Sequence, residues 1–204
     1  MTRIVLASAS PARRSLLVNA GVNPVVVVST IDEDAMARTL STLTPIELTM
    51  ELARAKARDV AERFTAADDV VIVGCDSMLE MDGVAHGKPA SAIEAKDRWR
   101  AMAGASGTLH TGHWLVRPST GHEVGEVAST VVYHASPSEA EIDAYIATGE
   151  PLRVAGAFTL DGLGGPFVER IDGDPSNVIG LSLPLVRLLL RDLGIVWTDL
   201  WQAP

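Results

Sequence analysis

The stretch Val70-Val71-Ile72-Val73-Gly74-Cys75-Asp76-Ser77 decides the expected fold. Four consecutive β-branched residues are typical of a central strand that helices cover on both faces of the sheet. The run leads directly into a carboxylate, so we expect Asp76 to stand at the end of this strand. Open α/β sheets bind ligands at such strand ends, which makes Asp76 a candidate base or metal ligand. A turn or cap residue is the alternative role for an aspartate there.

Strand-like and helix-like segments alternate on both sides of this run, as in an α/β protein. The pattern predicts strands over 3–7, 25–29, 110–116 and 124–133, and because the last two look antiparallel we expect a mixed sheet. It predicts helices over 11–19, 45–64, 92–102, 137–147 and 183–193. Asp82-Gly83 predicts a hairpin turn, and the stretch 158–171 is rich in glycine and broken by turns. We expect a single domain over 1–204.

The composition excludes several classes of function. The chain has 204 residues, with 17 Lys and Arg against 26 Asp and Glu, for a formal net charge of -9. This acidic balance argues against binding of a nucleic acid polymer or an anionic membrane, since both need clustered basic charge. No stretch approaches the roughly 18 apolar residues of a membrane span. The only cysteine, Cys75, cannot form a disulfide within the chain, which favours a reducing, cytoplasmic location.

Any phosphate that this acidic chain binds must be met by a few placed cations. In the segment 8–14, SASPARR, two serines and two arginines lie where a strand passes into a helix. Hydroxyls, free backbone N–H groups and a guanidinium are what an anion site requires, so Ser8, Ser10 and Arg13 are candidate ligands. The alternative is that Ser10 is an ordinary N-cap and that both arginines are surface charges.

Other charged residues are candidates for the same site only if the fold brings them together, because exposed charges are otherwise usually solvated. Lys88 lies between a glycine and a proline that would give it a defined direction, and Lys56 is the only lysine of the long helix expected over 45–64. The run Asp32-Glu33-Asp34 is read as a solvated acidic loop unless a metal is needed. No dinucleotide or P-loop fingerprint follows a strand, and the five histidines lack zinc spacing.

Taken in order, these motifs resemble the Maf family of nucleoside triphosphate pyrophosphatases. The resemblance covers nearly the whole chain, and the ordered set is far more specific than any one piece. It implies a mixed α/β fold around a long, curved sheet flanked by helices, with the site in a cleft between two lobes, and commonly a homodimer. The matching pieces are LASASPARRSLL (6–17), IDED (31–34), ELARAKA (51–57), GCDSM (74–78), GKP (87–89), YIATGEPLRVAGAFTLDGLGG (145–165) and GDPSNVIGLSLPLVRLLL (173–190).

The resemblance implies hydrolysis of a nucleoside triphosphate to the monophosphate and pyrophosphate. Asp76 would accept the proton of the attacking water, and Glu33 would share a divalent cation, Mg²⁺ or Mn²⁺, with Asp76 or with waters bound to it. The roles of base and metal ligand compete at Asp76, because a metal-bound carboxylate is a poorer base. The phosphate oxygens would be held by Arg13, Lys56 and Lys88, with further hydrogen bonds from Ser8 and Ser10.

Two departures from the family pattern concern the substrate. Ala12 replaces the first of two arginines that usually follow Ser-Pro, and Arg13 keeps the second. The positions that read the base fall on Ser77 and Asp161. The branch that selects thymidine and uridine triphosphates has Gln at the latter, and a branch that selects 7-methylguanosine triphosphate has Glu. Asp161 matches neither, so the preferred base stays open.

We therefore expect a housecleaning enzyme that hydrolyses non-standard or pyrimidine nucleoside triphosphates. One alternative is a non-catalytic, nucleotide-sensing regulator of cell division, which would keep the phosphate-binding cations and dispense with a base. Another is a phosphatase that releases inorganic phosphate stepwise. The placement of Asp76 after a buried strand weighs against the regulator.

Overall fold

Three long antiparallel strands form the axis of the molecule in the computed structural model, which describes residues 2–201. They are β3 (Val70–Met81), β5 (Ser106–Arg117) and β6 (His122–His134). A strand of 12 residues, as in β3, extends roughly 40 Å at about 3.3 Å per residue. Four shorter strands complete a seven-stranded mixed sheet of order β2-β1-β3-β5-β6-β7, with β4 paired to β3. These are β1 (Arg3–Leu6), β2 (Val25–Val26), β4 (Val84–His86) and β7 (Val168–Asp172).

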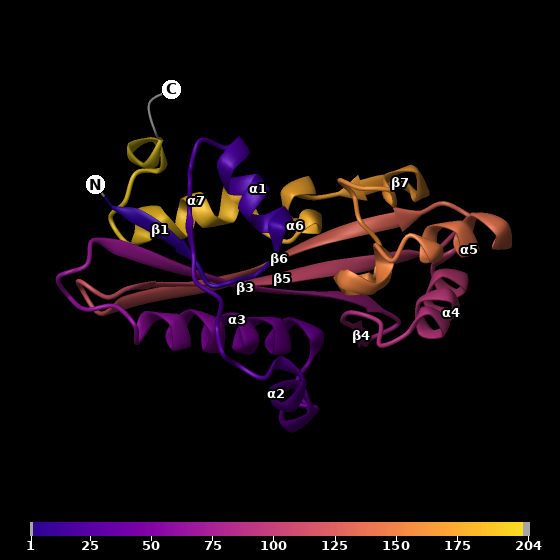
Figure 1. Ribbon diagram of the computed structural model, residues 1–204, viewed down its shortest axis with the longest axis horizontal. Helices are drawn as coiled ribbons and strands as arrows, with labels where there is room; N and C mark the ends of the chain where they lie inside the picture. The colour runs from indigo at the N-terminus through magenta and orange to yellow at the C-terminus, as the bar shows by residue number, and fades with distance from the viewer. Residues whose placement is uncertain (1, 202–204) are drawn as a thin grey trace.

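Helices cover both faces of one half of this sheet. The long helix α3 (Pro45–Ala61) crosses one face, and α1 (Pro11–Asn19) and α7 (Leu183–Asp192) lie on the opposite face (Figure 1). A capping box between Thr44 and Glu47 begins α3, and its buried stripe includes Leu52 and Val60. Because β1 and the first half of β3 are covered on both sides, their residues read as continuous apolar runs.

Two glycines let α3 lie unusually close to the sheet. A Cβ on Gly74 of β3 would stand 2.3 Å from the carbonyl oxygen of Ala53, and a Cβ on Gly112 of β5 would stand 2.3 Å from that of Thr49. Real Cβ atoms essentially never approach backbone oxygens so closely, so only glycine fits at both places. The close approach brings the side chains of α3 within reach of β3 just beyond Gly74.

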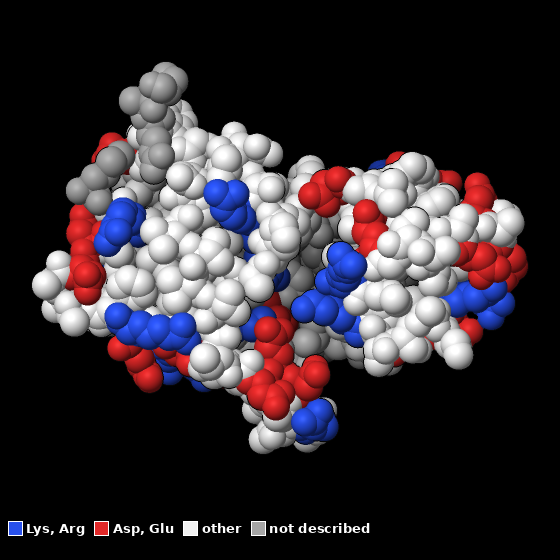
Figure 2. All heavy atoms as spheres, in the orientation of Figure 1, with Lys and Arg blue, Asp and Glu red and all other residues white. Residues whose placement is uncertain are grey.

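A second hydrophobic core lies at the other end of the long strands. Helices α4 (Ala92–Met102) and α5 (Glu139–Ala147) pack there around the buried rings of Trp99, Tyr145 and Phe158. Figure 2 shows the surface hollowed between this part and the part that carries β1, with charges of both signs at the margins of the hollow. The remaining elements are α2 (Glu33–Thr39), α6 (Pro175–Ile179) and the 3₁₀ turns η1 (Pro151–Arg153), η2 (Ala155–Ala157), η3 (Gly165–Phe167) and η4 (Trp197–Leu200).

The sheet edge that faces this hollow is uncovered over a short stretch of β3. The partner strand β1 ends where Leu6 pairs with Val73, and β4 begins where His86 pairs with Leu79. Residues 74–78 therefore have β5 on one side and no strand on the other. The motif that follows the β-branched run thus lies at the opening between the two parts.

The expected fold class, a mixed α/β sheet flanked by helices, is confirmed, and the helices predicted over 11–19 and 92–102 have those bounds. The hairpin at Asp82-Gly83 is also present, with both residues at positive φ. The prediction that Asp76 stands at a strand end is wrong. It lies in the middle of β3, because that strand continues as the antiparallel partner of β5 as far as Glu80.

Three further predictions need correction. The acidic run 32–34 is no loop: Asp32 caps α2, and its carboxylate accepts a hydrogen bond from the Ala35 N–H. The strand expected over 25–29 has only two residues, because its partner β1 already ends at Leu6. The stretch 158–171 contains the turn-like segments expected there but also enters β7, which pairs with β6.

Candidate functional site

The site is built around an ion pair between β3 and α3. Asp76 and Lys56 both have almost fully buried side chains, and the Lys56 Nζ lies 2.6 Å from the Asp76 Oδ1. The same ammonium lies 2.8 Å from the Glu33 Oε2 at the start of α2. Three residues that are far apart in the sequence therefore meet at one point. An ammonium has three N–H donors, so one remains after both carboxylates are served.

The two carboxylates differ in their readiness to hold a proton. Burial raises the pKa of Asp76 above its ordinary value, against the opposing charges of Lys56 and Arg13. Burial also acts to raise the pKa of Glu33, but there the charges of Lys56, Lys88 and Arg13 outweigh it, and the net shift is downward. Asp76 is therefore the better proton acceptor of the two, and Glu33 the more persistent negative charge.

Arg13 lies buried where α1, β3 and α6 meet. Its Nε donates to the Gly180 carbonyl at 2.6 Å, and its Nη1 donates to the Cys75 carbonyl and to the Ser8 Oγ at 3.0 and 3.1 Å. Its Nη2 donates to the Ser77 Oγ at 2.9 Å. These four bonds leave one of the five N–H groups of the guanidinium for a ligand.

The two serines of the first motif have different surroundings. The Ser8 Oγ accepts hydrogen bonds from the Ser10 N–H at 3.2 Å and from Arg13, so it belongs to the cluster around that guanidinium. Ser10 is the N-cap of α1, since its Oγ accepts from the Arg13 N–H at 3.3 Å. The capping role weighed against a ligand role for Ser10 is thus present in the structure.

The sequence did not single out Thr111 and Asn177, which complete a chain of hydrogen bonds behind Ser77. Because Ser77 accepts from Arg13 and the Thr111 hydroxyl donates to the Asn177 carbonyl at 3.2 Å, Ser77 donates to Thr111, 2.9 Å away. The fully buried Asn177 amide group in turn donates to the Leu109 carbonyl at 3.1 Å. An amide within the otherwise apolar stretch 177–181 was the available signal.

The two remaining predicted residues lie on the far side of the opening. Lys88 is exposed just after β4, and its charge helps to lower the pKa of Glu33, so it lies within electrostatic reach of the cluster. Asp161 is exposed in a loop that the Glu150 carboxylate holds through hydrogen bonds from Thr159 and the Gly164 N–H. Within residues 2–201, no hydrogen bond or ion pair joins Asp161 to Asp76 or Lys56.

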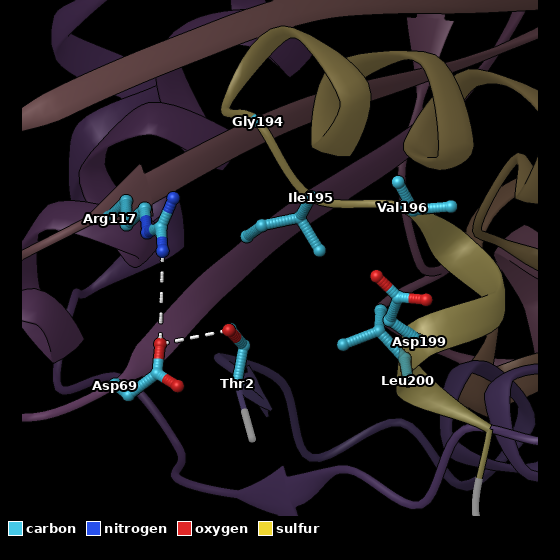
Figure 3. A pocket seen from close by; sticks show the side chains of 8 residues that line it. All are labelled: Thr2, Asp69, Arg117, Gly194, Ile195, Val196, Asp199 and Leu200. Atoms are coloured by element: carbon cyan, nitrogen blue, oxygen red, sulfur yellow. Dashed lines mark hydrogen bonds and ion pairs between the residues drawn. The ribbon is translucent and has the colours of Figure 1, made fainter.

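A separate hollow lies elsewhere on the surface, at the end of the sheet where β1 begins (Figure 3). Arg117 and Asp69 form an ion pair of 3.8 Å at its rim, and Thr2 donates to Asp69. None of the predicted site residues line it. Its lining residues are Thr2, Asp69, Arg117, Gly194, Ile195, Val196, Asp199 and Leu200.

Together these contacts form a site suited to a polyanion and a proton transfer. A buried carboxylate with a raised pKa stands beside buried Lys56 and Arg13, and the exposed Lys88 acts electrostatically on Glu33 of the same cluster. The carboxylates of Asp76 and Glu33 meet at the Lys56 ammonium, and within the described residues no cluster of three or more His, Cys, Asp or Glu is arranged to hold a metal ion. Every helix of residues 2–201 falls short of what a membrane span requires.

Known proteins resemble this chain over nearly its whole length. The family model described as Maf-like protein matches residues 3–193. A protein of Rhodococcus opacus, named nucleoside triphosphate pyrophosphatase, is 55% identical over 100% of this chain and 98% of its own length. One of Streptomyces coelicolor with the same name is 54% identical, over 98% of this chain and 94% of its own.

A solved structure of a nucleoside-triphosphatase / dITP/XTP pyrophosphatase from Mycobacterium abscessus was also found. It covers 67% of this chain and 76% of its own, at 16% identity and a TM-score of 0.37, and adds nothing to the description of the fold. The family model and the full-length relatives agree with each other and with the ordered motifs in the sequence. This chain belongs to the Maf-like protein family.

Proposed function

We propose that this chain is a nucleoside triphosphate pyrophosphatase, which hydrolyses its substrate to the monophosphate and pyrophosphate. The observation that carries the proposal is the buried Asp76 carboxylate, 2.6 Å from the Lys56 ammonium, at the uncovered edge of β3. Relatives with that name, 54–55% identical over nearly the full chain, support it.

In this proposal Asp76 acts as the general base. A water attacks the α-phosphorus, the new P–O bond forms as the bond to the bridging oxygen of the β-phosphate breaks, and the proton of the water passes to Asp76. A carboxylate whose pKa is raised by burial is better matched to this task than an exposed one. Pyrophosphate is the leaving group.

The cations of the site neutralise the triphosphate. Such a substrate carries about four negative charges, and stabilising them is the larger part of catalysis in phosphoryl transfer. Lys56 has one N–H left after pairing with Asp76 and Glu33, and Arg13 likewise retains one. Exposed Lys88 is free to turn toward the phosphates from the other side. Ser8 and Ser10 would add hydrogen bonds, and Ser77 and Asp161 would contact the base.

The donor set of the site fits a divalent cation. Mg²⁺ is commonly held by one or two protein carboxylates, with substrate phosphates and waters completing the octahedron. Glu33 and Asp76 are two such carboxylates, and their oxygens already converge on one positive charge, the Lys56 ammonium. Bound there, Mg²⁺ or Mn²⁺ would withdraw charge from the phosphate oxygens.

Three further expectations belong to the proposal. The substrate is a non-standard or pyrimidine nucleoside triphosphate, as the family resemblance implies, and Asp161, which matches neither of the better-known branches, leaves the preferred base open. Two copies of the chain form a homodimer, as the resemblance implies. The protein acts in the cytoplasm, which a single buried cysteine favours.

The test is a product analysis. The purified chain is incubated with a panel of standard and non-standard nucleoside triphosphates, with Mg²⁺, with Mn²⁺ or with a chelator, and the products are separated. Monophosphate plus pyrophosphate that requires the metal supports the proposal. Diphosphate plus phosphate would identify a stepwise phosphatase instead. Tight binding without turnover would identify the nucleotide-sensing regulator.

A further inference from the structure

The segment that carries Lys88 is held at both ends by one charged pair of α4. The Gly87 carbonyl, directly before Lys88, accepts a hydrogen bond from the Arg98 Nη1 at 2.5 Å. The Ala90 N–H, two residues after Lys88, donates to the Glu94 Oε2 at 2.8 Å. Between these two bonds lies Pro89, which is buried and has a restricted φ.

The two side chains of this pair also bind each other. The Arg98 Nη2 lies 2.6 Å from the Glu94 Oε1, one helical turn apart. The Arg98 side chain is only 7% exposed. Burial of a charged group costs desolvation free energy that an apolar residue at the same position of α4 would not cost. Its guanidinium fork serves the Gly87 carbonyl and Glu94 at once, which a single ammonium would not match.

The Gly87 carbonyl has a second partner from another part of the chain. The Gly156 N–H donates to it at 3.2 Å, and Gly156 has a positive φ of 71° and packs against Leu79 of β3. The backbone before Lys88 is thus fixed to α4, to η2 and, through η2, to β3. By contrast, no hydrogen bond or ion pair within residues 2–201 holds the Lys88 ammonium, which is exposed.

We propose that Arg98 and Glu94 are positioning residues that fix the backbone at Lys88 so that its ammonium meets the phosphates of the substrate. The proposal rests on the proposed pyrophosphatase function. A lysine stem has four carbons and high conformational entropy. Because the backbone on both sides of Lys88 is already anchored, substrate binding has to order only the lysine side chain. This lowers the entropic cost of binding a phosphate.

The test separates this role from a general structural one by kinetics. The variants are Arg98→Gln, Glu94→Ala, Lys88→Ala and the double variant Arg98→Gln with Lys88→Ala. We expect Arg98→Gln and Glu94→Ala to raise KM roughly 5- to 20-fold, with kcat changed less than about 3-fold. The double variant should have the KM of Lys88→Ala alone, because a positioning residue has nothing left to position.

A matched control comes from the same helix. Arg100 is exposed on α4 and pairs with Glu139, away from Lys88, so Arg100→Gln should keep the KM of the wild type. If Arg98→Gln fails to fold, Glu94→Ala at the exposed end of the pair carries the same cycle with Lys88→Ala. The proposal would be overturned if the two substitutions raised KM independently, so that the KM of the double variant exceeded that of Lys88→Ala by the factor seen for Arg98→Gln alone. A loss of kcat without a change of KM would also overturn it.

The positioning role can also be tested if the chain proves not to be a pyrophosphatase. If the wild type releases no pyrophosphate from any triphosphate, the same cycle is measured by equilibrium binding of a non-hydrolysable triphosphate analogue. Weaker binding by Arg98→Gln, and no further weakening in the double variant, would then support the positioning role alone. Equal binding by the wild type and Arg98→Gln would contradict it.

Discussion

At the scale of single residues, the site depends on one buried ammonium that serves two carboxylates. Lys56 joins β3 to the start of α2 through Asp76 and Glu33, and the environment drives the pKa values of the two carboxylates in opposite directions. A pair of titratable groups whose pKa values are pushed apart in this way is typical of acid–base sites. The proposed role of Asp76 as base rests on its burial as much as on its position.

Asp76→Asn tests that role. The amide keeps the shape of the side chain but can neither accept the proton nor carry the charge, so we expect turnover to fall at least ~100-fold while nucleotide binding survives. Initial rates of pyrophosphate release and equilibrium binding of a non-hydrolysable analogue measure the two effects. The control is Asp82→Asn in the exposed hairpin turn, which should be as active as the wild type. Near-normal turnover by Asp76→Asn would show that another group is the base.

At the scale of elements, the site exists because α3 lies close to β3 and β5. Gly74 and Gly112 stand beneath backbone carbonyls of α3, at distances that exclude any side chain. Lys56 is the residue of α3 that this approach brings to Asp76, two residues beyond Gly74 on the same face of the strand. The glycine of the GCDS motif therefore sets the distance at which its aspartate meets the lysine.

Gly74→Ala should damage both stability and activity. Its added methyl would overlap the Ala53 carbonyl oxygen, which can yield only if the helix moves. We expect the free energy of unfolding to fall by about 1–3 kcal/mol, as for other overpacked cores, and kcat/KM to fall because Lys56 moves with the helix. Urea denaturation and steady-state kinetics measure these effects.

The matched control is Gly87→Ala, where an added Cβ meets nothing within 4 Å, and the free energy of unfolding should stay close to that of the wild type. An unchanged free energy of unfolding for Gly74→Ala would contradict the steric argument.

At the scale of the whole molecule, three long strands connect two parts, each with its own buried apolar residues, and leave an opening between them. The core of the part formed by α4 and α5 contains His134, which is 2% exposed and packs edge-on against Trp99 and Phe158. Within residues 2–201, neither of its ring nitrogens has a hydrogen-bond partner. Burial lowers the pKa of His134 to about 4, although the Ala105 backbone opposes the shift.

This histidine makes the fold sensitive to acid. Below pH 6.5, the unfolded chain binds a proton at this ring while the folded chain does not, so stability falls with falling pH until about pH 4. His134→Leu should remove this contribution to the pH dependence. Between pH 8 and pH 5.5, the free energy of unfolding of the variant should fall by about 1 kcal/mol less than that of the wild type. Urea denaturation at both pH values measures the difference. Because each protein is compared with itself, the altered packing of the variant cancels. Equal pH dependence in both proteins would contradict the assignment.

The sequence by itself determined the fold class, most of the helices and the chemical types of the site residues. Amphipathic periodicity and caps such as Ser10 are local, so the bounds of the helix that Ser10 begins are readable from the chain, whereas α5, expected from residue 137, begins at Glu139. The family was likewise readable, because its motifs are ordered along the sequence, and the family model confirms it.

Only the tertiary structure decided where these residues stand. The β-branched run showed that a buried strand begins at Val70, but its length depends on the partner strand β5, which lies about thirty residues away in the sequence, and so Asp76 was misplaced at a strand end. The position of Arg13 was equally hidden, because its guanidinium donates to the backbone carbonyls of Cys75 and Gly180, which are distant in the sequence. So was the pair of Arg98 and Glu94 that holds the backbone around Lys88. Local pattern reports which face of an element is apolar, whereas hydrogen bonds between distant segments form only when the whole chain has packed.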